Sequence, residues 1–365
     1  MIYFDHNATT ALDERVLQDM LPYLTQLYGN PSGLYRLARI SRSAIETARE
    51  QIAQLVNARP EHIIFTSGGT EANNLALKSG LIKRHFISSA IEHASIYESS
   101  PSSLIKNTII SVNTAGEINT QQISDTPAFD FASFMLANNE TGVIQDIKKI
   151  TQLVKAQGGL MHTDAVQALG KLSVDFQQLD VDLMSISSHK IYGPKGCGAL
   201  IAKQTELMQP LLTGGGQEIA LRSGTENVAA IVGFGKAAEL ARVELEVRQL
   251  HNLKLKNHLE QQLQKISNIS IFSQDSDRIS NTVQIGVEGC IGEMLLMQLD
   301  QQNIAVSSGS ACASSDEASS HVLAAMGVSS SLAQSAIRIS FGKNNTLEEV
   351  DSFVAKLKQN IIKNR

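Results

Sequence analysis

A short apolar run leads directly into a polar cluster in LMSISSHK, residues 183–190. Residues 183–186 have the length and composition of a buried β-strand. Lys190 follows that strand and precedes a Gly/Pro-rich segment, residues 191–196. A lone lysine usually carries a solvated charge. This setting instead predicts a partly buried amine at the end of a strand.

Similar apolar runs recur along the chain, at residues 63–65, 86–87, 134–136, 160–162 and 199–201. Between them lie helix-like stretches such as residues 72–79 and 147–157. From about residue 16 to 235 this alternation predicts a mostly parallel sheet with helices on both faces. Ligands of such sheets bind at the carboxyl ends of the strands. The position of Lys190 therefore suits a ligand site.

The last third of the chain has a different pattern. One apolar stripe runs through residues 235–266, at Leu240, Val243, Val247, Leu250 and Leu253. It predicts a long helix that packs on a core and links two domains. Residues 282–287 and 337–341 then alternate like strands, and residues 294–302 and 347–358 have helical spacing. These elements predict a second, smaller α+β domain.

Composition excludes several classes of function. The net charge of −5, the absence of Trp and the 5% aromatic content argue against direct nucleic-acid binding. Three cysteines without a C-x-x-C pair predict neither a disulfide framework nor a thiolate metal site. The amino terminus lacks a signal-peptide pattern, and no apolar run approaches the roughly 18 residues that span a membrane. We therefore expect a cytoplasmic protein without a bound metal.

Two further segments at predicted strand ends carry chemical groups. TSGGTE, residues 66–71, directly precedes a helix, and its glycines free backbone N–H groups for a phosphate. An ordinary tight turn explains this segment equally well. Asp164, in HTDAVQ (residues 162–167), could cap a helix or pair with a protonated heterocyclic nitrogen, as a pyridoxal cofactor requires. Burial of Lys190 would lower the pKa of its amine and free it for Schiff-base chemistry. The phosphate loop, Asp164 and Lys190 together are far more specific than any one of them.

A cysteine and an arginine complete the candidate site. Cys197 and Cys290 have the surroundings of buried apolar residues, whereas Cys312 lies in a run of small polar residues, 307–315. That run predicts an exposed loop, where a thiolate can accept sulfur. Arg338 follows on an alternating strand, from which its guanidinium could bind a substrate carboxylate.

These segments together resemble the cysteine desulfurases of the NifS/IscS type, which are dimeric fold-type I pyridoxal-phosphate enzymes. The resemblance runs from residue 4 to about 350. It implies a large α/β domain with a mostly parallel mixed sheet at residues 16–250. Residues 1–15 and 251–365 would form the smaller α+β domain that carries the catalytic cysteine loop. The motifs that carry the resemblance are residues 4–10, 66–71, 138–142, 162–164, 188–196, 222–225 and 308–312.

The resemblance also implies a role for each site residue. Lys190 would bind the cofactor covalently and move the Cα proton, Cys312 would accept sulfur as a persulfide, and His93 would stack on the cofactor ring. The other implied cofactor ligands are Gly69, Thr70, Asn139, Asp164, Gln167, Ser187, His189 and, from the partner subunit, Thr225. The implied substrate ligands are Arg338, Asn139 and Asn7. The products would be alanine and a persulfide for an acceptor protein.

The sequence departs from the family pattern in three places. Residues 30–35, NPSGLY, lack the family's histidine, and residues 316–320, DEASS, replace a Leu-Glu-Pro-Ser stretch. The chain also ends at Arg365, without the tail that engages an iron–sulfur scaffold. The missing tail argues against a general iron–sulfur role and favours a dedicated acceptor, such as a tRNA thiolation enzyme or a DNA phosphorothioate system.

Two rival interpretations remain open. An aminotransferase or a selenocysteine lyase would use the same cofactor residues. Cys312 argues against an aminotransferase but does not exclude selenocysteine as a substrate. A non-catalytic protein that only keeps the fold is disfavoured by the complete residue set.

Overall fold

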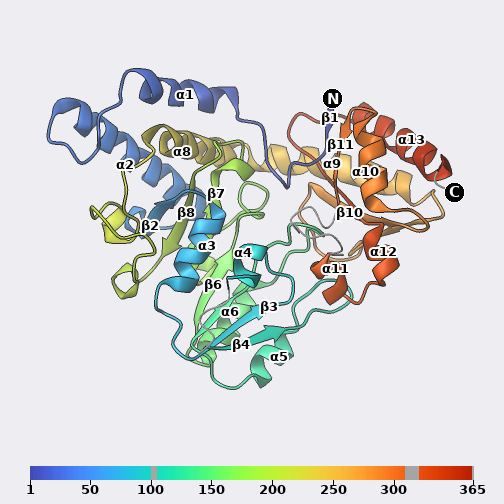
Figure 1. Ribbon diagram of the computed structural model, residues 1–365, viewed down its shortest axis with the longest axis horizontal. Coiled ribbons are helices and arrows are strands. Elements are labelled where there is room, and N and C mark those ends of the chain that lie inside the picture. Colours follow the sequence, from blue (N-terminus) through green and yellow to red (C-terminus); the bar gives the residue numbers. More distant parts are fainter. Residues whose placement is uncertain (100–104, 309–319, 364–365) are drawn as a thin grey trace.

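The computed structural model describes residues 1–99, 105–308 and 320–363 (Figure 1). Its larger sheet has seven strands in the order β2-β8-β7-β6-β5-β3-β4. The strands β7, β6, β5, β3 and β4 run parallel to one another, whereas β8 runs antiparallel to both β7 and β2. The mostly parallel mixed sheet is confirmed. The strand bounds are β2 Ile63–Thr66, β3 His85–Ser89, β4 Lys106–Ile110, β5 Phe131–Ser133, β6 Leu160–Asp164, β7 Leu183–Ser187 and β8 Gly198–Ala202.

Both faces of this sheet are buried because successive side chains point to opposite sides. Ile63 and Phe65 of β2 belong to a core that includes side chains of α2, α6 and α8, whereas Ile64 belongs to a core shared with α3. This explains why the strands are apolar without alternation. The helices of this part are α1 Glu14–Thr25, α2 Arg36–Val56, α3 Gly69–Lys78, α4 Ala94–Tyr97, α5 Thr120–Asp125, α6 Ile147–Ala156, α7 Phe176–Leu179 and α8 Val228–Val243, with short 3₁₀ turns η1 Pro60–His62, η2 Ser188–Lys190, η3 Thr205–Leu207 and η4 Glu218–Ala220.

A second hydrophobic core gathers the C-terminal elements and the start of the chain. Phe4 packs in it with residues between 255 and 361. Figure 1 shows the amino terminus among the orange and red C-terminal elements, where β1 pairs with β11. The elements are β1 Ile2–Tyr3, α9 Leu245–Leu263, β9 Ile269–Ile271, β10 Thr282–Val287, α10 Gly292–Asp300, β11 Ile304–Ala305, β12 Ser307–Ser308, α11 His321–Ala325, α12 Ser330–Gln334, β13 Ile337–Ser340 and α13 Leu347–Lys363. The domain boundary near residue 250 stays a prediction.

Two sequence-based expectations were wrong in detail. The strand expected at residues 134–136 is β5, three residues earlier, although the backbone N–H groups of Phe134 and Leu136 still donate to carbonyls of β6. The single helix expected over residues 235–266 is two helices, α8 and α9, interrupted at Glu244. Of its apolar stripe, Leu240 packs in the main core, whereas Val243, Val247 and Leu250 are 62–71% exposed.

None of the helices in the described ranges is long and apolar enough to cross a membrane. Cys197 and Cys290 are buried, as expected for small apolar residues.

Candidate active site at the carboxyl ends of the strands

Lys190 lies in η2, immediately after the carboxyl end of β7. Its Nζ donates hydrogen bonds to the backbone carbonyls of Asn7 and, at 2.9 Å, Ala8. The backbone carbonyl of the neighbouring His189 accepts hydrogen bonds from the N–H and the hydroxyl of Thr10, at 3.0 and 2.9 Å. The amino-terminal segment is therefore fixed against the lysine, although the two are about half the chain apart in sequence.

Asp164, at the carboxyl end of β6, is connected to α3. Its Oδ2 accepts a hydrogen bond of 2.7 Å from Nδ2 of Asn73, and its Oδ1 accepts one from the backbone N–H of Val166 at 2.9 Å. The same Nδ2 of Asn73 donates to Oγ of Ser95 at 2.8 Å. Asp164 is only 6% exposed, so these donors compensate part of the cost of burying its charge.

His93 continues this network as the N-cap of α4. Its Nδ1 accepts a hydrogen bond from the backbone N–H of Ser95 at 3.1 Å and lies 2.8 Å from Oγ of the same serine. Because Nδ1 is an acceptor, the proton is assigned to Nε2. Burial lowers the pKa of His93; Asp164 opposes this shift and Lys190 adds to it. A neutral imidazole therefore lies in the electrostatic field of both Asp164 and Lys190.

A cradle of unpaired donors lies at the start of α3. Gly68, the N-cap residue, provides no side-chain hydrogen bond, so the first N–H groups of α3 remain available. A Cβ on Gly69 would lie 2.8 Å from Cγ2 of Val166 and 3.6 Å from Cβ of Ser187. The hydroxyl of Ser187 is buried and has no hydrogen-bond partner within the described residues. Thr70 is exposed in the first turn of the same helix.

The predicted substrate ligands gather around one arginine. Arg338 of β13 donates from one terminal nitrogen to the backbone carbonyl of Asn139 at 2.9 Å and from the other to Oδ1 of Asp5 at 2.7 Å. Its Nε is buried and has no partner in the described part of the chain. Asn7 donates to the same Asn139 carbonyl at 3.2 Å. Because Asn7 is 1% exposed and both ends of its amide bind protein groups, its contact with substrate stays a prediction.

Two predicted residues are not brought into this group. Thr225 is exposed, and no contact joins it to the residues above in the ranges that the structure describes. Cys312 lies outside the described residues. The two residues that flank its segment do reach the site. Ser308 of β12 pairs with Ile337, beside Arg338, and the Oγ of Ser320 donates a 2.5 Å hydrogen bond to Glu140.

Comparisons with known proteins agree with this arrangement. The model of the class-V aminotransferase family matches residues 2–353. The cysteine desulfurase IscS of Methanosarcina thermophila is 40% identical over 360 residues, which cover 96% of this chain and 89% of that protein. The chain belongs to the cysteine desulfurase family. Its fold is that of fold-type I enzymes: a solved NifS-like protein from Rickettsia africae ESF-5 superposes with a TM-score of 0.92 at 37% identity, covering 100% of this chain and 99% of the other.

One further relative in this family was solved with a small molecule. A structure described as SspA in complex with cysteine superposes with a TM-score of 0.82 at 32% identity. The match covers 95% of this chain and all of that one.

The site residues fit pyridoxal phosphate, the cofactor that the cysteine desulfurase resemblance implies. The uncapped start of α3 and the unpaired hydroxyl of Ser187 provide donors for a phosphate. Asp164 provides a buried carboxylate for a protonated ring nitrogen, and Lys190 an amine at the adjacent strand end. Burial, followed by the charge of Lys190, lowers the pKa of His189 to about 4, so that side chain can contribute hydrogen bonds without charge.

Three residues of the site were not found from the sequence. Asn73 links Asp164 to Ser95, Lys171 donates to Gln167 and Asn7, and Glu92 is fully buried before His93. A polar residue on the apolar face of a helix, between Ala72 and Ala76, was the available signal for Asn73. Lys171 follows Gln167 by four residues in a turn, which gave no comparable signal.

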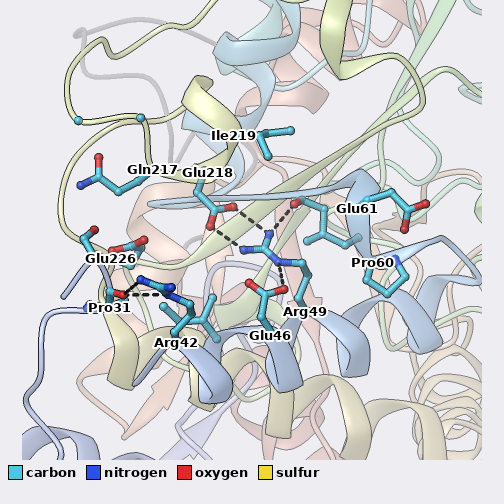
Figure 2. Close-up of a pocket in the computed structure, with 15 residues that line it drawn as sticks. Pro31, Arg42, Glu46, Arg49, Pro60, Glu61, Gln217, Glu218, Ile219 and Glu226 are labelled. Atoms are coloured by element: carbon cyan, nitrogen blue, oxygen red, sulfur yellow. Dashed lines mark hydrogen bonds and ion pairs between the residues drawn. The ribbon is translucent and has the colours of Figure 1, made fainter. Parts of the chain in front are cut away.

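A separate cavity lies away from these residues. It has a volume of about 550 Å³ and is lined by residues of α2, η1 and the segment around η4. Figure 2 shows Arg49 there between the carboxylates of Glu46 and Glu218, which it binds at 3.1 and 2.7 Å. None of the predicted cofactor ligands lines it. In the described ranges, no group of three His, Cys, Asp or Glu side chains could hold a metal.

Proposed function

We propose that this protein is a pyridoxal-phosphate-dependent cysteine desulfurase, which converts L-cysteine to L-alanine and leaves the sulfur on Cys312. The observation that carries this proposal is the gathering of Lys190, Asp164 and the open start of α3 at one edge of the sheet. The family membership supports the reaction, because relatives of similar length are named cysteine desulfurases. We regard the cytoplasmic location as a prediction.

The cofactor supplies an electron sink for the charge that develops when the substrate Cα loses its proton. The chain supplies the positions and the proton transfers. Lys190 would hold the cofactor covalently, then act as the base that takes the Cα proton once substrate has replaced it. Asp164 would keep the ring nitrogen protonated, and the neutral imidazole of His93 would stack on the ring.

Sulfur transfer then requires a nucleophile and a carboxylate anchor. Arg338 would bind the substrate carboxylate, because its buried guanidinium has an unused Nε and a fork of donors. The thiolate of Cys312 attacks the substrate sulfur, forming an S–S bond. The C–S bond breaks, its electron pair passes to Cβ, and Cβ takes up a proton, while Lys190 would return its proton to Cα. The products are alanine and a persulfide on Cys312, without an external oxidant.

We further propose that the enzyme is a homodimer that passes its sulfur to an acceptor protein. The exposed position of Thr225 is compatible with a role in the partner subunit's site, as the family resemblance implies. The class of acceptor stays open between a scaffold and a thiolation enzyme.

The test is turnover of L-cysteine with a thiol reductant by purified protein loaded with pyridoxal phosphate. Alanine and sulfide should appear in equal amounts. Cys312→Ser should lose sulfide release, and Lys190→Ala should lose the covalent link that borohydride traps in the wild type. Full sulfide release by Cys312→Ser, or a trapped link in Lys190→Ala, would show that the assigned roles are wrong.

A further inference from the structure

A second lysine is buried behind the cofactor site. Lys171 is 8% exposed and lies four residues after Gln167. Its Nζ donates to Oε1 of Gln167 at 2.7 Å and to Oδ1 of Asn7 at 2.9 Å. Its backbone carbonyl accepts a hydrogen bond from Gln249 of α9 at 2.7 Å. Lys171 is therefore held in place by hydrogen bonds at both its backbone carbonyl and its Nζ.

The surroundings of Lys171 favour a neutral amine. Burial lowers its pKa well below the ordinary value, and the cations of Lys190 and Arg338 lower it further. A neutral amine has two N–H groups, and both have an acceptor in Gln167 and Asn7. Because both acceptors are neutral amide oxygens, no carboxylate stabilises an ammonium through these contacts.

The hydrogen bond from Lys171 fixes which way the amide of Gln167 points. With Oε1 occupied by Lys171, Nε2 faces the opposite side and donates to the carbonyl of Asn7 at 3.0 Å. That carbonyl also accepts the hydrogen bond from Lys190. The amide nitrogen of Gln167 is therefore adjacent to the Lys190 amine, and its second N–H has no acceptor within the described residues.

We propose that Lys171 is a positioning residue that holds the Gln167 amide with its second N–H, the one not bound to Asn7, toward the cofactor. This inference rests on the proposed function, since it assigns Gln167 to a cofactor ring oxygen. An N–H directed at that oxygen stabilises its anionic form and lowers the pKa of the nitrogen that joins Lys190 to the cofactor. Lys171 acts only through Gln167 and Asn7 and has no contact with the substrate.

The test follows the pH at which the absorbance band of the bound cofactor changes. Lys171→Met removes both N–H donors and should raise this midpoint by roughly 0.5 to 1 pH unit, about the effect of one hydrogen bond. Gln167→Leu should raise it similarly. The double variant should equal Gln167→Leu alone, because Lys171 then has no amide to orient. Lys256→Met is the control, since Lys256 is also 8% exposed but lies in α9 near Arg278; its midpoint should match the wild type.

An unchanged midpoint in Lys171→Met, or additive shifts in the double variant, would overturn the proposal. If the methionine variant does not fold, Lys171→Gln, which keeps a donor, takes its place. It should raise the midpoint by a smaller amount, and an unchanged midpoint in this variant would contradict the role of Lys171. If the wild type forms no coloured complex with pyridoxal phosphate, the proposed function fails, and this inference fails with it. If the wild type titrates normally and only the predicted shifts are missing, the proposed function stands.

Discussion

Burial keeps several ionisable side chains around Lys190 in their neutral forms. It lowers the pKa of His93 and brings that of His189 to about 4. It raises the pKa of Glu92, the residue before His93, to about 8. Glu92 accepts hydrogen bonds from Ser89 and from the backbone N–H of Met135, but its Oε2 is buried and unpaired within the described residues. A neutral carboxyl group at this position avoids a second buried negative charge near Asp164.

The first prediction concerns Glu92 and stability. The folded protein keeps this proton to about pH 8, whereas the unfolded chain releases it near pH 4.5. The raised pKa therefore stabilises the folded state at low pH, and this contribution is lost as pH rises from 4.5 to 8. Glu92→Gln removes that dependence. As the pH is raised from 5 to 8, the free energy of unfolding of the variant should therefore increase by about 1 to 4 kcal/mol relative to that of the wild type.

Urea unfolding of both proteins at the two pH values measures this difference. Glu288→Gln, at an exposed position, is the control and should follow the wild type. Parallel pH dependences for the wild type and Glu92→Gln would show that Glu92 is ionised in the folded protein.

At the scale of elements, close backbone packing shapes the phosphate cradle. Gly198 begins β8 and lies directly against the loop before α3. A Cβ at this position would be 2.7 Å from backbone atoms of Gly68 and 2.8 Å from the carbonyl of Ile186. None of these atoms belongs to a flexible side chain, so the loop itself would have to move.

Gly198→Ala should therefore weaken binding of pyridoxal phosphate at least about tenfold and cost about 1 to 3 kcal/mol of stability. Gly158→Ala is the matched control. Its φ is +78° and no atom lies within 4 Å of the added Cβ, so it should cost about 1 kcal/mol through strain alone. Cofactor titration followed by absorbance, with thermal unfolding, separates the two effects. Wild-type cofactor affinity in Gly198→Ala would contradict this account of the loop.

The sequence predicted a helix or strand correctly where its apolar residues alone form the buried face. The strand at residues 282–287 has the predicted bounds, because its apolar side chains Val283, Ile285 and Val287 alternate and pack together in the second core. Helix α9 was misjudged, because its buried face at the amino end is polar. Arg248, Asn252 and Lys256 are buried there, and Arg248 binds Glu244 and covers the ring of Tyr192. A pattern of apolar residues cannot identify a buried face formed by charged side chains.

At the scale of the whole molecule, distant segments meet at Arg338. The arginine joins the amino-terminal Asp5, the loop residue Asn139 and the small sheet of β9, β10, β12 and β13. The sequence indicated the residue types at the strand ends. The family resemblance implied that Arg338 and Asn139 act together, but nothing in the sequence indicated the ion pair of Arg338 with Asp5 or the contacts of Asn73 and Lys171, because hydrogen bonds between remote side chains leave no local periodicity.

Arg338→Lys should raise the KM for cysteine roughly 10- to 100-fold with a smaller change in kcat, because a lysine loses the fork that binds a carboxylate. Arg278→Lys is the control: both arginines are 7% exposed, but Arg278 pairs with Glu260 and contacts none of the predicted site residues in the described ranges. Steady-state kinetics measure KM and kcat separately for each variant. An equal rise in KM for both variants would indicate a general effect of replacing a buried arginine.

The central claim is that sulfur from cysteine ends on Cys312 while Lys190 serves the cofactor. The most direct measurement is a single turnover without reductant, followed by peptide mass spectrometry and alanine analysis. The account predicts one alanine per subunit and one added sulfur atom on the peptide that contains Cys312, both absent in Lys190→Ala. Alanine formed without added sulfur on that peptide, or sulfur carried by Cys197 or Cys290 instead, would contradict it.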